Sequence, residues 1–358
     1  ILIISLIFKA ITTYIEVKFL QMCEYNVSKR LVEGYLYQPY IWFLNRNSAE
    51  LGKSILSQVS IVIDIMRSLM SLISKSIIAI ALIALLIIAN PKLSMIVGLT
   101  LSLTYGIIFY FTRKYLNSLG KENLKNDELR FIAVSEAFGA AKEIKVGGLE
   151  RAYIKSYSNA AKIFAQNKAI LKVISQLPRY ILEGIAFGGI MLLILYLMSQ
   201  EGSFNNAIPV ISLYAFAGYR LMPVMQNIYI SLSQISFSSP SLDNLYYDIG
   251  KLNPIKNNDL EEKLSFDKEI VLNNIDFNYP NTSQKALQGI SLNIPAKSTI
   301  GLIGATGSGK TTLLDIILGL LMSDKGTLEI DGEVLSKKNL RSWQRNIGYV
   351  PQHIYLSD

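Results

Sequence analysis

Long apolar segments separated by short polar turns constrain this chain more than any other feature. Residues 77–89 are thirteen consecutive apolar residues, IIAIALIALLIIA, and with residues 69–76 they reach the ~20 residues that span a bilayer. Three segments of similar length, and a weaker one interrupted by charged residues, bring the candidate spans to five: residues 1–20, 69–89, 93–111, 180–198 and 207–230. Buried helices of a soluble core are the alternative, but four such segments in succession favour a membrane domain.

The charged residues give this membrane domain an orientation. Only 17% of the residues are charged, against about 25% in ordinary soluble domains. Residues 265–358 carry nine basic and nine acidic residues, so the whole net charge of +8 belongs to the apolar part, which favours membrane lipids over nucleic acid as partners. Thirteen Lys and Arg fall in residues 113–180, and one falls in residues 90–92 and 199–206 together. The positive-inside rule therefore predicts that 113–180 is cytoplasmic and that the two short turns are external.

The ends of the chain and its rare residues set further limits. One cysteine, Cys23, and one histidine, His353, exclude an intrachain disulfide framework and a Cys/His metal cluster. The sequence begins inside an apolar run without Met, so we expect a further segment before it. We also expect the domain that reaches Asp358 to continue beyond it.

Polar and charged stretches divide the chain into three parts. Apolar residues at helical spacing within residues 113–180 predict helices that leave the membrane, turn near residues 142–150 and return. Residues 38–47 predict a second cytoplasmic turn, and residues 251–264 are polar enough for a linker. The expected parts are a transmembrane domain at residues 1–250, the linker at 251–264 and a separate domain at 265–358.

The last part changes to short β-rich runs around a glycine-rich loop. The predicted strands are residues 270–277, 286–294, 299–303, 327–330 and 347–350. Between the third run and an apolar helix lies GATGSGKTT, residues 304–312, which satisfies G-x-x-x-x-G-K-[ST]. An isolated match can be an ordinary Gly-rich turn, but the strand before it and the helix after it favour a phosphate-binding loop. The spacing excludes a dinucleotide-binding G-x-G-x-x-G.

The chemistry of phosphate binding requires these residue types. Glycines permit left-handed backbone conformations, so that successive N–H groups converge on phosphate oxygens, and the N-terminus of the following helix adds to the same field. Lys310 is expected to reach the β- and γ-phosphates, and the Thr311 hydroxyl is placed to ligate Mg²⁺. The predicted nucleotide-binding residues of the loop are Gly304, Thr306, Gly307, Ser308, Gly309, Lys310, Thr311 and Thr312.

Two residues outside the loop narrow the class of phosphate-binding protein. Tyr279, in DFNYP, precedes the loop, and its ring can stack on a purine; a surface tyrosine in a turn is the alternative. Gln352 follows a predicted strand, and its amide can complete the shell of Mg²⁺ or of an attacking water; a turn glutamine is the alternative.

In this order, Tyr279, the glycine loop, the turn Asp331-Gly332 and the run Val350-Pro351-Gln352 resemble the first half of the cassette of ATP-binding cassette (ABC) transporters. The apolar spans before them resemble the exporter type, in which an α-helical transmembrane domain is followed by an α/β P-loop NTPase domain, here partial. The resemblance implies a homodimer in the bacterial inner membrane, with ATP and Mg²⁺ as cofactors and the ATP-binding domain in the cytoplasm. It also implies that Lys310 and Gln352 are catalytic, and that residues 38–47 and 142–150 are coupling helices.

Several family motifs do not occur in the sequence. These are the LSGGQ-like signature, the Walker B aspartate with its catalytic glutamate, and the switch histidine; His353 directly follows Gln352 and is not the latter. The resemblance therefore implies that the complete protein hydrolyses ATP, whereas residues 1–358 alone do not.

The membrane part contains two arginines that are candidates for substrate binding. Counted from the predicted external turn, Arg220 lies ~21 Å and Arg179 ~30 Å down their helices, and a charge at membrane depth is a functional candidate. Guanidinium groups pair well with phosphate, which suggests a phosphate-bearing lipid headgroup. The alternatives are that Arg179 pairs with Glu183 and that Arg220 snorkels or bonds to a neighbouring helix.

The amino-acid sequence of the membrane part is similar to that of PglK-type lipid-linked oligosaccharide flippases, in stretches such as YQPYIWFLNRNS and SQLPRYILEGIAFGG. This similarity implies that the substrate is a polyprenyl-diphosphate oligosaccharide. Exporters of drugs, other lipids or peptides share the architecture. A membrane-anchored P-loop kinase or regulator without transport is the alternative of another class.

Overall fold

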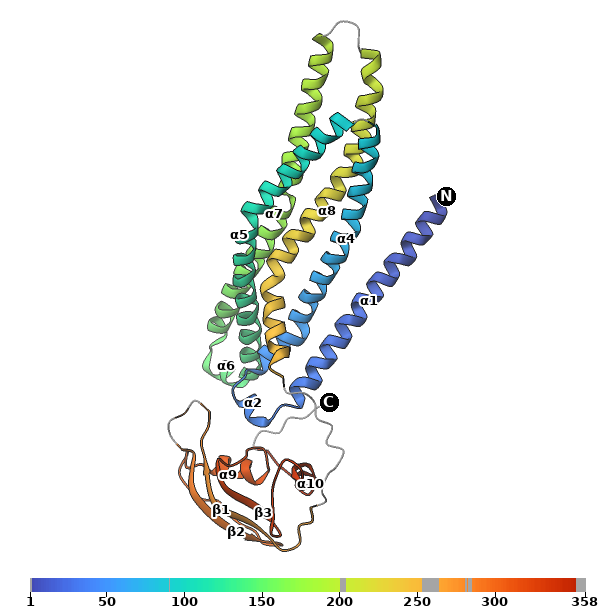
Figure 1. Cartoon of the computed structure of the whole chain (residues 1–358). Helices are drawn as coiled ribbons and strands as arrows, with labels where there is room; N and C mark the ends of the chain where they lie inside the picture. The colour runs from blue at the N-terminus through green and yellow to red at the C-terminus, as the bar shows by residue number, and fades with distance from the viewer. Residues whose placement is uncertain are drawn as a thin grey trace. The chain divides into compact units, whose positions relative to one another are not determined.

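The computed structural model describes residues 2–89, 91–199, 204–252, 264–280, 282 and 285–351. The chain divides into two compact units, which are described separately (Figure 1). The helical unit comprises Ile1–Leu36 and Asn47–Leu252, and the sheet unit comprises Tyr37–Arg46 and Asn253–Asp358. The architecture is thus a helical domain followed by a smaller domain of strands and helices, as the sequence predicts.

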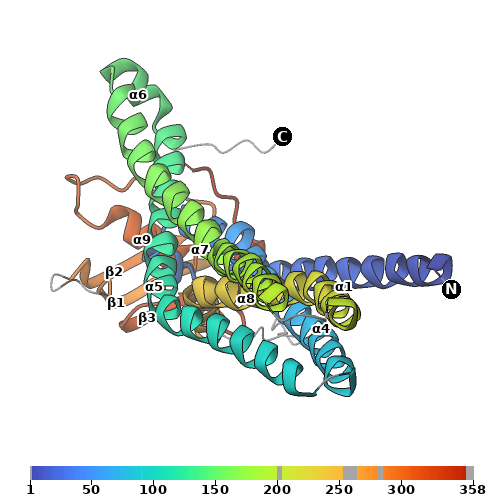
Figure 2. The same cartoon turned by 90° about the horizontal axis from the view of Figure 1, so that it is seen from above.

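Long helices dominate the helical unit. Its elements are α1 (Leu2–Leu36), α3 (Ser48–Lys53), the π-helix η1 (Ser54–Gln58), α4 (Val59–Ala89), α5 (Pro91–Gly139), α6 (Ala141–Gly147), α7 (Glu150–Ser199) and α8 (Phe204–Gly250). α4 packs along α8, and α5 packs along both α7 and α8. Figure 2 shows α6 at the end of the long α5–α7 pair. The cytoplasmic turn predicted at residues 142–150 corresponds to α6 and the start of α7.

Within the described residues, one helical segment has the length and the apolar composition needed to cross a membrane. Ser48–Ile88 is long and apolar enough to cross a bilayer. The predicted spans at residues 93–111, 180–198 and 207–230 are helical and lie in α5, α7 and α8, but the burial of many of their side chains is not described. The weaker candidate at residues 1–20 lies in α1 and does not have this composition, because its three charged side chains exceed what an apolar span tolerates.

α5 and α8 approach each other closely at Gly120. A Cβ atom built on Gly120 would overlap the backbone carbonyl oxygen of Phe237. Around this point Leu116, Leu171 and Phe237 belong to one buried apolar cluster. Glycine has no Cβ atom, so it allows the two helix backbones to come this close.

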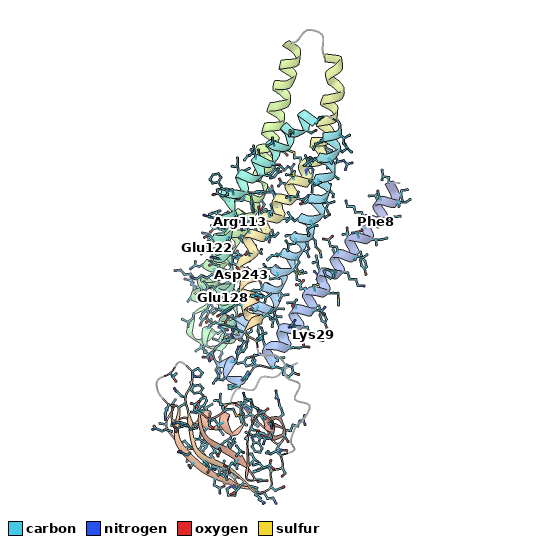
Figure 3. The ribbon with its side chains drawn as sticks, viewed as in Figure 1. Phe8, Lys29, Arg113, Glu122, Glu128 and Asp243 are labelled. Carbon is cyan, nitrogen blue, oxygen red and sulfur yellow. The ribbon has the colours of Figure 1, made fainter. Side chains whose placement is uncertain are left out.

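Polar contacts join the helices at the charged end of the helical unit. The buried Lys53 ammonium lies 3.0 Å from the Glu128 carboxylate, and the Ser57 hydroxyl donates to Asp127 at 2.8 Å. Figure 3 labels Glu122 and Glu128 on this part of α5, and Glu122 accepts a hydrogen bond from the Asn167 amide of α7 at 3.1 Å. These contacts fix α3 and η1 against α5, and α5 against α7.

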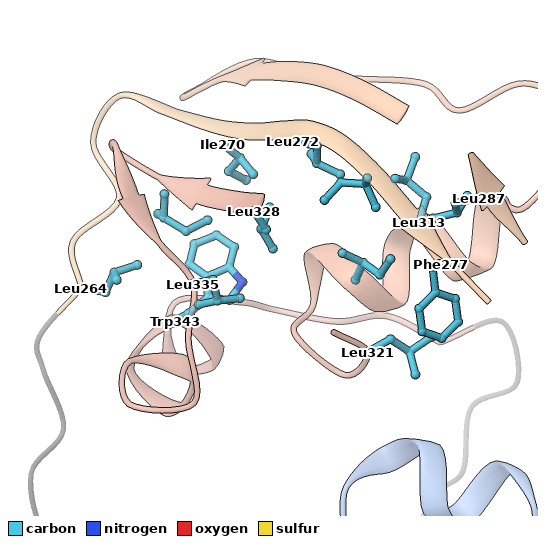
Figure 4. Packing of buried hydrophobic residues seen from close by; sticks show 13 residues of the cluster. Leu264, Ile270, Leu272, Phe277, Leu287, Leu313, Leu321, Leu328, Leu335 and Trp343 are labelled. Carbon is cyan, nitrogen blue, oxygen red and sulfur yellow. The ribbon is translucent and has the colours of Figure 1, made fainter. Parts of the chain in front are cut away.

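In the described part of the sheet unit, four antiparallel strands form a sheet in the order β2-β1-β3-β4. Its elements are α2 (Tyr40–Leu44), β1 (Glu269–Phe277), β2 (Leu287–Pro295), α9 (Lys310–Ile317), β3 (Lys325–Ile330), β4 (Glu333–Val334) and α10 (Leu340–Arg345). Figure 4 shows the core, in which Leu272 and Leu328 from the sheet meet Leu313 of α9 and Trp343 of α10. The core therefore places α9, which follows the glycine loop, against the sheet.

Two of the five predicted strands are wrong. Residues 299–303 and 347–350 form no strand, whereas β1, β2 and β3 cover the other three runs. A strand requires a neighbour that completes its backbone hydrogen bonds, and within the described residues neither run has one. Their side chains are correspondingly open to solvent: Ile303 is 99% exposed and Val350 is 84% exposed.

A two-residue turn joins β3 to β4 and also holds the start of β1. Asp331 and Gly332 have φ of +52° and +87°, as a type I′ hairpin turn requires. The Asp331 carboxylate accepts hydrogen bonds from the backbone N–H groups of Asp267, Lys268 and Glu269 at 2.6 to 2.8 Å. The N–H of Asp267, followed by those of Glu269 and Lys268, holds the pKa of Asp331 below its ordinary value.

This pKa predicts a pH-dependent contribution to stability. Because the carboxyl is more acidic in the folded state, its contribution is present above the unfolded pKa of about 3.9 and is lost as the pH falls through the lower folded pKa. Asp331→Asn keeps the turn preference but removes the charge, so it should destabilise the sheet unit at pH 7 and converge with wild type in acid. Both tryptophans, Trp42 and Trp343, belong to the sheet unit. Tryptophan fluorescence during urea unfolding at several pH values therefore measures the stability of this unit.

Asp267→Asn is the matched control, because Asp267 donates to Asp331 through its backbone N–H, which the substitution keeps while it removes one carboxylate charge. An equal loss of stability for both variants at pH 7 would contradict the proposed role of Asp331.

Candidate nucleotide-binding site

The glycine loop lies directly before α9, and two of its glycines adopt conformations that other residues avoid. Gly307 has a φ of +82°, and Gly309, at the N-cap of α9, has a φ of +87°. A Cβ atom on Gly309 would also lie 2.7 Å from the carbonyl oxygen of Ala286. Backbone conformation and close approach therefore both require glycine at position 309. Gly304, Thr306 and Ser308 are exposed in the same loop.

The Lys310 side chain folds back over this loop. Its ammonium donates to the carbonyl oxygens of Gly304 at 2.8 Å and Ala305 at 2.7 Å, and lies 3.3 Å from the Ser308 hydroxyl. The ammonium therefore sits where the loop concentrates polar groups. An anion on the loop would meet this positive charge and the N-terminus of α9 together.

Thr311 and Thr312 occupy the first turn of α9 with different environments. Thr311 is exposed, so its hydroxyl is accessible to a ligand. Thr312 is 6% exposed, and its hydroxyl lies 3.0 Å from the Tyr279 hydroxyl. The structure thus brings Tyr279 to the helix that follows the glycine loop, although 33 residues separate it from Thr312.

The short helix α2 adds a tyrosine to this region that the sequence did not single out. Ile41 of α2 packs against the apolar core of the sheet unit. Burial raises the pKa of Tyr40, and the nearby Asp315 and Tyr279 act in the same direction. Burial also raises the pKa of Asp315 on α9. The sequence signal for this contact was the run of aromatic residues after Pro39, because a short turn exposed to solvent rarely contains several aromatic side chains.

Family comparisons cover most of the chain. Residues 1–219 match the ABC transporter transmembrane region, and residues 287–358 match the family described as ABC transporter. The chain belongs to the ABC transporter family.

Individual ABC transporters resemble this chain at low identity. An ATP-dependent lipid A-core flippase of Ralstonia nicotianae is 23% identical over 343 residues, which are 92% of this chain and 56% of the relative. A putative export ATP-binding/permease protein of Rickettsia bellii is 25% identical over 341 residues, 91% of this chain and 58% of the relative. The chain thus spans little more than half the length of these curated relatives.

A solved structure shows the same fold. The structure of a bacterial Atm1-family ABC exporter with ATP bound superposes with a TM-score of 0.75 at 16% identity, covering 97% of this chain and 61% of that one. The exporter fold expected from the sequence is therefore confirmed, and the protein is a membrane protein.

The residues of this ABC transporter fit the nucleotide that its family binds. Left-handed glycines, the exposed start of α9 and the Lys310 ammonium form a donor set suited to a polyphosphate. The described residues contain no group of His, Cys, Asp and Glu that would hold a metal by itself. Mg²⁺ would therefore depend on the Thr311 hydroxyl, phosphate oxygens and water, as is usual for this ion. Gln352, the other predicted ligand, lies outside the described residues.

The two arginines predicted to bind substrate differ in their surroundings. The Arg179 guanidinium pairs with Glu183 at 2.8 Å, which is the alternative that the sequence offered for it. Arg220 is exposed on α8, next to the buried Leu221. Arg179 of this ABC transporter thus already has an anionic partner, and the role of Arg220 in substrate binding stays a prediction.

Proposed function

We propose that the complete protein is an ATP-driven exporter that flips a lipid-linked, amphipathic substrate across the bacterial inner membrane. The observation that carries this proposal is the presence of a phosphate-binding loop and a transmembrane region of the ABC family in one chain. The similarity to an ATP-dependent flippase supports a lipid substrate. A homodimer with cytoplasmic ATP-binding domains is part of the same proposal.

Different residues of the nucleotide-binding site bind the phosphates, the base and the Mg²⁺ ion of MgATP. Backbone N–H groups of the glycine loop and the Lys310 ammonium bind the phosphates, Tyr279 stacks on the base, and Thr311 with Gln352 ligates Mg²⁺. The Lys310 ammonium exchanges the carbonyls of Gly304 and Ala305 for phosphate oxygens when the nucleotide binds. Bound MgATP supplies the energy of transport through its different affinity for the inward- and outward-facing states.

The headgroup of the substrate is the more specific part of the proposal. A polyprenyl-diphosphate oligosaccharide carries a diphosphate beside its lipid, and the Arg220 guanidinium is suited to that group. Because Arg179 already has an anionic partner in Glu183, it contributes less to this binding. Drugs, other lipids and peptides are the alternative substrates.

The test is ATPase activity of the complete protein in proteoliposomes with each class of substrate. A lipid-diphosphate sugar should stimulate ATP hydrolysis and should be flipped when ATP is added. Arg220→Gln should lower the stimulation, and the control Arg220→Lys should retain part of it because it keeps the charge. ATP hydrolysis without any transported class would instead favour a membrane-anchored kinase or regulator.

A further inference from the structure

The Tyr279 ring is fixed at two places by buried groups. Its edge-to-face partner is Phe277 of β1, with ring centroids 5.1 Å apart and an interplanar angle of 88°. Its hydroxyl lies 3.0 Å from the Thr312 hydroxyl of α9. Phe277 is 2% exposed and Thr312 is 6% exposed, so neither anchor is free to move independently of the core.

The two anchors belong to the parts that also place the glycine loop. Phe277 and Leu313, both labelled in Figure 4, pack in the core cluster between β1 and α9. Thr312 directly follows Thr311 and lies two residues after Lys310. The bond to Thr312 therefore sets the position of the Tyr279 ring relative to the phosphate-binding groups.

We propose that Thr312 is a positioning residue for base recognition, which holds the Tyr279 ring at the distance from the phosphate loop that a purine nucleotide requires. This rests on the proposed binding of ATP. A ring held in place before binding loses less conformational freedom when a base stacks on it. The contribution should appear for ligands that have a base and not for the phosphate chain alone.

The competing role for Thr312 is direct contact with a phosphate. Both roles predict weaker ATP binding when the hydroxyl is removed, so ATP affinity alone does not separate them. Magnesium tripolyphosphate separates them, because it has the phosphate chain and no base. Tyr279→Phe gives a second separation, since it removes the same hydrogen bond from the other side and keeps the ring.

The experiment measures the dissociation constants of MgATP and magnesium tripolyphosphate for the complete protein by calorimetry. Thr312→Val and Tyr279→Phe should each weaken MgATP binding by about five- to tenfold, because binding must then immobilise the freed Tyr279 side chain, and should leave tripolyphosphate binding unchanged. The double variant should be no worse than either single variant, and Thr312→Ser should restore affinity because it keeps the hydroxyl. Tyr279 is half-buried, and Tyr279→Phe keeps the ring, so this variant should fold. Its MgATP affinity tests the inference even if Thr312→Val folds poorly.

Three results would overturn the inference. These are an equal loss for both ligands in Thr312→Val, additive losses in the double variant, or wild-type MgATP affinity in Tyr279→Phe. A wild-type protein that binds neither ligand would instead refute the proposed function, so the two failures are distinguishable.

Discussion

Lys310→Ala is expected to abolish ATP-dependent transport and to weaken MgATP binding by about 10²- to 10⁴-fold. The estimate follows from the loss of two charge-assisted hydrogen bonds to phosphate oxygens, each worth roughly 1.5 to 3 kcal/mol, at about 1.4 kcal/mol per tenfold change. In the described structure the Lys310 ammonium contacts Gly304, Ala305 and Ser308 of the glycine loop, so the substitution removes a positive charge from the loop itself. The measurement is MgATP affinity and ATP-driven flipping by the complete protein in proteoliposomes.

Lys337→Ala is the matched control for this prediction. Lys337 is an exposed lysine of the same unit, so its replacement changes the net charge equally without touching the loop. Because Lys310 also bonds to two carbonyls of its own loop, tryptophan fluorescence should first establish that the variant is folded. Retention of ATP-dependent flipping in a folded Lys310→Ala protein would refute the proposed function.

The features that the sequence predicts well are those encoded by neighbouring residues. The spacing of glycines before Lys310 indicates a loop with left-handed backbone, and Gly307 and Gly309 adopt it. Asp331-Gly332 indicates a turn for the same reason, since both residues tolerate positive φ. The helical spacing of apolar residues likewise extends α5 and α7 beyond the membrane part.

Features that depend on distant residues were not predictable in this way. The apolar runs at 299–303 and 347–350 have the composition of strands, but a strand exists only where a neighbour completes its hydrogen bonds. The bond between Tyr279 and Thr312 joins two separate elements, so neither local pattern contains it. The roles of Tyr279, Gln352 and Arg220 in binding remain predictions.

Gly120→Ala is expected to disrupt the packing of the helical unit by more than about 3 kcal/mol, well above the usual effect of one added methyl group. The added Cβ would overlap the Phe237 carbonyl oxygen, which is part of the α8 backbone and is not able to rotate away as a side chain does. α5 and α8 must then separate, which opens the apolar cluster of Leu116, Leu171 and Phe237. The same substitution elsewhere on a helix normally stabilises it, because alanine has a helix propensity about 1 kcal/mol better than glycine.

Gly106→Ala supplies this comparison on the same helix. Nothing lies within 4 Å of a Cβ atom built on Gly106, so that variant should be as stable as wild type or slightly more stable. Cys23 is the chain's one cysteine and lies half-buried on α1 of the helical unit, so its reaction with a thiol-reactive fluorophore during heating reports on this unit. The midpoint should fall sharply for Gly120→Ala and stay near wild type for Gly106→Ala. Equal midpoints for the two variants would show that α5 and α8 do not approach each other at Gly120, because the α5 helix propensity gained is the same in both.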